Sequence, residues 1–277
     1  MAWKESISAM IVQTAPAGMP RLVIRHVDHA AMSGKFAQAF GGGAFDPLAP
    51  ADLMVWVAAH HDDGWLEIDS DPLIDPETNL PYNLADTPWP TLMRPHAISP
   101  EVAEAYHPYC GLLVSMHTTG LYNGRYGVMS ASIDVIPDAL RPAAEAMLAA
   151  EDARQARLRD ICADDPALAA FCTPEALMAN YRRLQFVDAL AVILNLRHPT
   201  QQKPYTFART PRSVGDEVDI VLTPAGDGCV TLDPYPFRDA PLTVSVGGRW
   251  IEPGTPDPRA ALTAAPVVDQ AWTLMPV

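Results

Sequence analysis

The segment at residues 51–62 (ADLMVWVAAHHD) constrains the fold most, because it is apolar on almost every side of a helix. A helix that lacks a polar face is stable only when other elements bury it. The chain must therefore build a core around this segment. Asp63 and Gly64 follow it directly and predict the end of the helix.

Helical patterns also occupy much of the remaining chain. Apolar residues spaced by three and four, with start and stop signals at the ends, predict further helices at residues 28–40, from about 100 to 117, at 138–162 and at 175–196. The last helix has the clearest beginning, because Thr173 can cap it and Pro174 suits its first turn.

Strand patterns lie at both ends of the chain. Residues 7–13 and 20–27 flank a turn and predict a β-hairpin. Beyond Pro199, alternating apolar segments predict strands at residues 216–223, 229–235 and 241–248. We therefore expect a mainly α fold, with a helical core and added β-strands from the N-terminus and from the C-terminal tail.

The same patterns divide the chain into two parts. We expect residues 1–198 to form a helical domain with an N-terminal β-hairpin. Residues 199–277, which are rich in proline, should form a β-containing extension packed on that domain.

The charge balance limits the partners. The chain has 19 Lys and Arg against 33 Asp and Glu, a formal net charge of −14. An acidic chain repels phosphate backbones and anionic lipid heads, so we expect neither a nucleic-acid nor a membrane partner. The chain shows neither an apolar run long enough to cross a bilayer nor a signal-peptide core, which predicts a cytoplasmic protein. The sequence leaves open whether it forms a homo-oligomer.

Polar side chains fall on the inner faces of several predicted helices. They are His29, the pair His61 and Asp62, His117, and Asp188. One core histidine is usually a structural residue, but a lone buried carboxylate is unfavourable unless it is paired or binds a metal. The coincidence of all these residues favours a single metal site. Imidazole and carboxylate together suit Fe, Mn, Co, Ni or Zn.

These residues also resemble a known pattern. The order His29, His61-Asp62, Asp188 is similar to the H…HD…D pattern of the HD-domain superfamily of helical metalloproteins. More narrowly, some motifs resemble an uncharacterised bacterial family of HD-like proteins: DHAAMSG (28–34), HDDGW (61–65), DPETNLPYNL (75–84) and LLVSMH (112–117). The resemblance covers residues 10–197 well and the C-terminal tail less well.

The resemblance implies a fold and a ligand set. Residues 1–198 should form an HD-domain-like, metal-binding helical core. His29, His61, Asp62 and Asp188 match the ligands of one metal. In HD proteins with two metals, the HD aspartate bridges both ions and two further histidines bind the second. His117 and His96 are the candidates for these two positions, although Pro95 makes the surroundings of His96 look non-helical. We expect one or two divalent ions, with Fe or Mn as the first choices.

Two residues are candidates for catalysis. Asp63 follows the His-Asp pair and could hold or deprotonate a water; it could equally be an ordinary helix-end residue. Lys35 lies six residues after His29 on the first predicted helix and could reach a substrate anion, although a solvated lysine is the simpler interpretation.

Four further residues are candidates for binding the substrate. Arg125 follows the predicted helix of His117 and could grip a phosphate or carboxylate, because a guanidinium forms paired hydrogen bonds with such groups. Trp65, Tyr82 and Asn83 lie in and near a proline-rich segment and could form a lid; packing within a loop is the alternative.

The predicted function follows from these residues. The first hypothesis is a metal-dependent hydrolase of the HD-domain type, which acts on a small polar, phosphorylated substrate through a metal-activated water. The second is a diiron oxygenase similar to myo-inositol oxygenase, and the third is a non-catalytic metal-binding module. The sequence separates the first two poorly, because both use the same ligands.

Overall fold

The computed structural model describes residues 10–83, 87–124, 134 and 136–277. Its helices are α1 (His26–Ala39), α2 (Ala51–His60), α3 (Leu66–Ser70), α4 (Trp89–Tyr106), α5 (Pro108–Asn123), α6 (Arg141–Asp164), α7 (Pro174–Leu196) and α8 (Pro258–Ala264), with short 3-10 turns at Asp63–Trp65, Ala169–Phe171 and Pro199–Gln201. Its strands are β1 (Ile11–Val12), β2 (Arg21–Ile24), β3 (Ile74–Asp75), β4 (Leu80–Pro81), β5 (Tyr205–Ser213), β6 (Asp216–Gly226), β7 (Cys229–Asp233), β8 (Leu242–Ile251) and β9 (Val268–Pro276).

One large sheet joins the two ends of the chain. It has seven strands in the order β1-β2-β8-β9-β7-β6-β5. Neighbouring strands are antiparallel except β7 and β9, which run parallel. Because β2 pairs with β8, strands from both sides of residue 198 belong to the same sheet. The N-terminal pair β1 and β2 confirms the predicted hairpin.

The predicted mainly α, HD-domain-like architecture is wrong, because this mixed sheet is a full layer of the core. Phe207, Leu232 and Trp272 project from its strands into the same apolar cluster as Leu112 and Leu184 from the helices. The sequence patterns did not predict β5 and β9. The size of a sheet depends on pairing between distant strands, which local patterns do not reveal.

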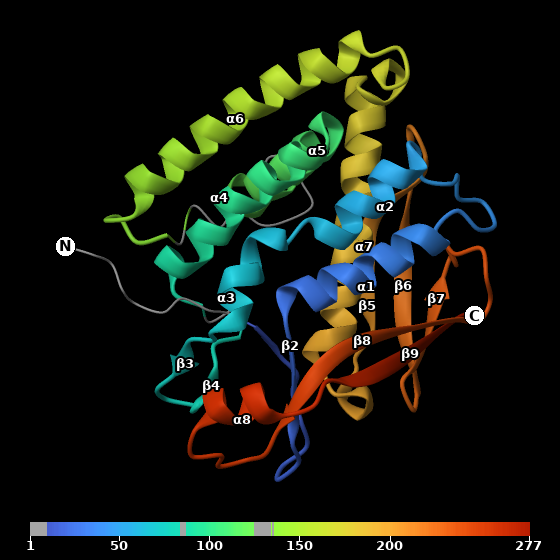
Figure 1. Ribbon diagram of the computed structural model, residues 1–277. Coiled ribbons are helices and arrows are strands. Elements are labelled where there is room, and N and C mark those ends of the chain that lie inside the picture. Colours follow the sequence, from blue (N-terminus) through green and yellow to red (C-terminus); the bar gives the residue numbers. More distant parts are fainter. Residues whose placement is uncertain (1–9, 84–86, 125–133, 135) are drawn as a thin grey trace.

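The helices stack on this sheet in layers. Helices α1 and α7 contact it directly, α1 at β8 and α7 at β5 (Figure 1). Helix α2 packs on α1, and the hairpin of α4 and α5 lies farther from the sheet, with the long helix α6 along its outer side (Figure 1). None of the described helices is long and apolar enough to cross a membrane. Helix α7 starts as predicted, since the Thr173 hydroxyl accepts a hydrogen bond from the Ala176 N–H.

The single helix predicted from about residue 100 to 117 is wrong, because the chain is extended at His107 between α4 and α5. Helix α4 also starts earlier than predicted and contains His96 between Pro95 and Pro100. A proline has no N–H, so Pro100 cannot donate to the carbonyl four residues earlier, which belongs to His96. That carbonyl instead accepts a hydrogen bond of 3.0 Å from the Thr118 hydroxyl of α5. Pro100 thus leaves this carbonyl free to tie α4 to α5 at the level of His96.

Two glycines, one inside α1 and one just after α2, let backbones approach closely. A Cβ at Gly34 would lie 2.6 Å from the Cβ of Ala59, and a Cβ at Gly64 would lie 2.3 Å from the Pro95 carbonyl oxygen. Real Cβ atoms do not approach other atoms so closely. Gly34 therefore sets the distance between α1 and α2, and Gly64 sets the distance between the turn after α2 and helix α4.

We expect Gly34→Ala to destabilise the protein by about 1–3 kcal/mol, because the new methyl group overpacks the contact with α2. Helix propensity alone predicts the opposite, a gain of about 1 kcal/mol. Thermal or urea unfolding decides between the two, with Gln38→Ala at an exposed position of α1 as control. A variant at least as stable as the wild type would show that the contact is not tight.

Candidate metal centre

The predicted ligands come together between the helix layers. His29 projects from α1, His61 and Asp62 lie just past the end of α2, His117 projects from α5 and Asp188 from α7. The His side chains are almost completely buried. Residues separated by up to 159 positions, 29 and 188, are thereby in direct contact.

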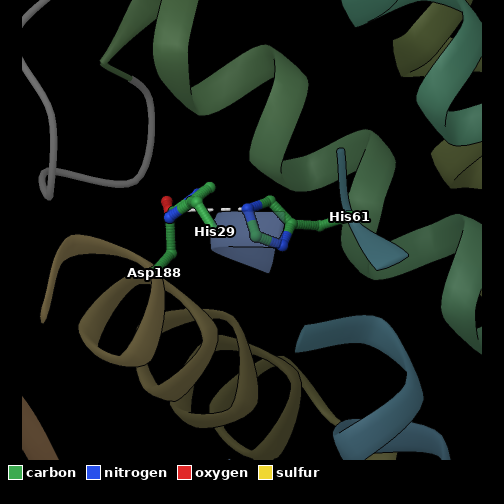
Figure 2. Close-up of side chains that lie close together, drawn as sticks. All are labelled: His29, His61 and Asp188. Atoms are coloured by element: carbon green, nitrogen blue, oxygen red, sulfur yellow. Dashed lines mark ion pairs between the residues drawn. The ribbon is translucent and has the colours of Figure 1, made fainter. Parts of the chain in front are cut away.

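The tightest group is formed by His29, His61 and Asp188 (Figure 2). Asp188 Oδ1 lies 3.1 Å from His29 Nε2 and 3.4 Å from His61 Nε2. One ligand atom from each of the three residues lies within 4.8 Å of the others, so these atoms could hold one metal ion.

A second group adjoins the first and shares His61 with it. His61, Asp62 and His117 also offer ligand atoms within 4.8 Å of one another. The rings of His61 and His117 meet edge to face with centroids 5.1 Å apart. Asp62 Oδ2 of the second group lies 3.6 Å from Nε2 of both His29 and His61, so it also approaches the first group. The arrangement could hold one ion or two neighbouring ions.

Hydrogen bonds from outside the cluster orient two of these rings. His61 Nδ1 lies 3.0 Å from the Ala58 carbonyl oxygen, which only an N–H can pair with, so Nε2 keeps its lone pair. That buried Nε2 makes no well-aligned hydrogen bond. His117 Nδ1 lies 2.6 Å from the Gln185 amide nitrogen, and this contact fixes the orientation of the His117 ring. Outer partners of this kind are typical of metal-binding histidines.

The electrostatics also suit a cation. Burial opposes charge on every group, yet the hydrogen bonds with Asp188 and Asp62 outweigh it and raise the pKa of His29 to about 9. Burial likewise opposes ionisation of Asp188, but His61 and His29 hold its pKa well below the usual range. Two buried carboxylates thus demand positive charge, which protons on the imidazoles or a metal ion can provide. The donor set of imidazole and carboxylate fits a divalent transition metal.

His96 lies near this cluster but outside both groups. Its Nδ1 atom is 3.0 Å from the Tyr122 hydroxyl, and its ring meets Trp65 edge to face at 5.5 Å. Burial lowers the pKa of His96 to about 4, so its imidazole is neutral at physiological pH. A neutral imidazole is the form that binds metals.

A cavity of about 430 Å³ opens beside the cluster. Both carboxylates, Asp62 and Asp188, line it, as do His96 and Trp65. Trp65 is fully buried, and its ring stacks on that of His26 with centroids 3.9 Å apart. Packing against His26 and His96 therefore places Trp65, one of the predicted substrate-binding residues, at the cavity.

Neither predicted catalytic residue lines the cavity. Asp63 Oδ2 lies 2.9 Å from His60 Nδ1, and Lys35 Nζ donates a 2.7 Å hydrogen bond to the Ser245 carbonyl. Arg125 lies outside the described residues.

Tyr82 and Asn83 hold the N-terminal strand. The Tyr82 carbonyl accepts a hydrogen bond of 3.0 Å from the Met10 N–H, and Asn83 Oδ1 accepts one of 3.2 Å from the Val12 N–H. Neither residue lines the cavity.

Sequence reasoning missed two residues that the structure places at the site. Gln185, which contacts His117, precedes Asp188 by three positions on α7, and His26 precedes His29 by three on α1. Residues three apart share one face of a helix. That spacing was the available signal, because polar residues one turn before a buried ligand point to the same place.

A family model described as "Protein of unknown function (DUF3891)" matches residues 10–253. The chain belongs to this family. No curated protein and no solved structure matches it. The DUF3891 description names no reaction, so the resemblance to HD proteins stays a hypothesis. The matched range contains both candidate ligand groups of this DUF3891 protein, together with β8.

We expect Asp188→Ala to weaken metal binding by about 100-fold or more, because the carboxylate contacts two of the imidazoles. Asp188→Asn keeps the shape but loses the charge, so it should retain the melting temperature better than the metal. Elemental analysis after native purification, with thermal unfolding, measures both. Asp63→Asn, which alters the neighbouring carboxylate that pairs with His60, is the matched control. Full metal occupancy in Asp188→Ala would contradict the assignment.

Proposed function

We propose that the protein is a metal-dependent hydrolase that acts on a small molecule. The observation that supports this most is the pair of ligand groups sharing His61, which lie beside a cavity lined by both carboxylates. Four free cysteines, three of them buried, are consistent with our further proposal of a reducing, cytoplasmic location.

His29, His61 and Asp188 would hold one ion, and Asp62 with His117 would hold a second. When bound, such ions act as Lewis acids and make water nucleophilic near neutral pH. Asp62 lies between the two groups and would contribute to both. Gln185 and the Ala58 carbonyl would keep the rings of His117 and His61 in the ligating orientation.

His26 is the residue that could accept a proton in the reaction. Its Nδ1 atom lies 3.4 Å from Asp69 Oδ1, and the Val27 N–H donates to the other oxygen of that buried carboxylate at 3.2 Å. Its Nε2 atom is buried without a hydrogen-bond partner, and the residue lines the cavity. A histidine oriented by a carboxylate, with its second nitrogen free, is the usual arrangement of a general base.

The diiron oxygenase remains the second candidate for one reason. Several aromatic and aliphatic side chains line the cavity, among them Trp89, Leu121 and Tyr205. An apolar lining limits access of water, which a hydrolase consumes and an oxygenase excludes from reactive intermediates.

Metal analysis of natively purified protein, followed by turnover of p-nitrophenyl phosphate, bis-p-nitrophenyl phosphate and p-nitrophenyl butyrate, tests the proposal. We expect a stoichiometric divalent metal and hydrolysis that a chelator abolishes. His26→Gln should lower the rate by about 100-fold or more while the metal stays bound. His60→Gln, outside the cavity, is the control.

Two results would contradict the hydrolase. Protein that binds no divalent metal under any loading condition would remove its basis. Two irons with a mixed-valent EPR signal, together with oxygen uptake and no hydrolysis, would support the oxygenase instead. A rate unchanged in His26→Gln would remove that residue from the mechanism.

A further inference from the structure

The cavity beside the ligand cluster changes polarity along helix α7. Asp188, Val192 and Leu196 follow one another at intervals of four residues and all line the cavity. Eight residues of α-helix span about 12 Å. One face of α7 therefore leads from a carboxylate in the cluster to aliphatic side chains about 12 Å away.

The cavity lining contributed by helices α4 and α5 also changes from polar to apolar. On α4, Leu92 lies one turn before His96, and on α5, Leu121 lies one turn after His117; all four line the cavity. Because α4 and α5 form an antiparallel hairpin, a position before His96 and a position after His117 lie at the same end. Both leucines thus lie on the same side of the histidines.

We call the aliphatic and aromatic part of the lining the apolar wall: Trp89, Leu92, Leu121, Val192, Ile193 and Leu196. These side chains are only partly buried, whereas Leu190 and Leu194 of α7 are fully buried in the core. Large apolar side chains that stay accessible inside a concave site are stabilised when a ligand covers them. The cavity volume of about 430 Å³ is sufficient for a small organic molecule.

The described apolar wall offers no cationic side chain. Among the residues of the described chain that line the cavity there is neither lysine nor arginine, and its charged groups are the carboxylates Asp62 and Asp188 with their histidines. A substrate that carries anionic groups away from the cluster would find no partner on the apolar wall. The wall therefore selects for an uncharged hydrocarbon group.

We propose that the substrate is amphiphilic, with a polar, hydrolysable head at the histidine–aspartate cluster and a hydrocarbon body along the apolar wall. This inference rests on the proposed function for the nature of the head. The distance of about 12 Å from Asp188 to Leu196 is sufficient for an extended alkyl or arylalkyl group. The body is recognised by burial of apolar area, and the head by the cluster.

A homologous series of alkyl hydroxamates tests the inference, because a hydroxamate is a metal-chelating head on a tail of chosen length. Metal-loaded protein is titrated with acetohydroxamate, butanohydroxamate, hexanohydroxamate and octanohydroxamate, and Kd is measured by calorimetry. We expect the affinity to rise by about threefold to fourfold for each added methylene group. An affinity that is the same across the series would overturn the inference.

A pair of variants locates the tail. Val192→Trp should fill the space along the apolar wall, weaken octanohydroxamate by about tenfold or more, and leave acetohydroxamate unchanged. Met178→Trp is the matched control, since Met178 is also apolar, partly exposed and on α7 but does not line this cavity. Equal effects of both variants on the long probe would overturn the inference. If Val192→Trp fails to fold, the wild-type series alone decides.

Metal-free protein distinguishes this inference from the proposed function. Chelator-treated wild type is titrated with 1-butanol and 1-octanol, which have no chelating head. Tighter binding of 1-octanol, lost in Val192→Trp, supports the apolar wall even if the protein proves to bind no metal. A bound metal without any dependence on tail length would leave the proposed function standing and refute the amphiphilic substrate.

Discussion

The structure depends on compensating the charge of two largely buried carboxylates. Asp62 and Asp188 meet the imidazoles of His29 and His61 between the helix layers, and each carboxylate approaches both rings. Removing a partner from such a group leaves an uncompensated buried charge, which is far more unfavourable than the net gain from an intact pair. The positions of α1, α2 and α7 relative to one another are therefore tied to this cluster.

Close backbone contacts supply the precision that the cluster requires. Gly34 brings α1 against α2, and Gly64 brings the turn after α2 against α4. The carbonyl of His96, released by Pro100, fastens α4 to α5 through Thr118. Glycine and proline are often regarded as helix breakers. Here Gly34 and Gly64, which lack a Cβ, and Pro100, which lacks an N–H, make the close contacts between helices possible.

The sequence predicted which polar residues come together better than it predicted the fold, for a physical reason. A buried polar residue disturbs an apolar helical stripe wherever it lies, so His29, His117 and Asp188 were visible in local patterns. The extent of the sheet depends on β2 finding β8 across most of the chain, and no local pattern records that pairing. The sequence also did not reveal where the side chains of Lys35 and Asp63 point, because Lys35 binds the Ser245 carbonyl and Asp63 pairs with His60.

The pairing of β2 with β8 has a consequence for the order of assembly. Helix α1 carries His29 and packs against β8, which ends at residue 251 of 277. Because β8 begins only at residue 242, His29 is made long before the surface on which its helix rests. Contacts between such distant segments form slowly, since a long loop must close before they are made. Until β8 is made, the nascent chain therefore carries an unfinished core, in which the apolar helix α2 needs protection.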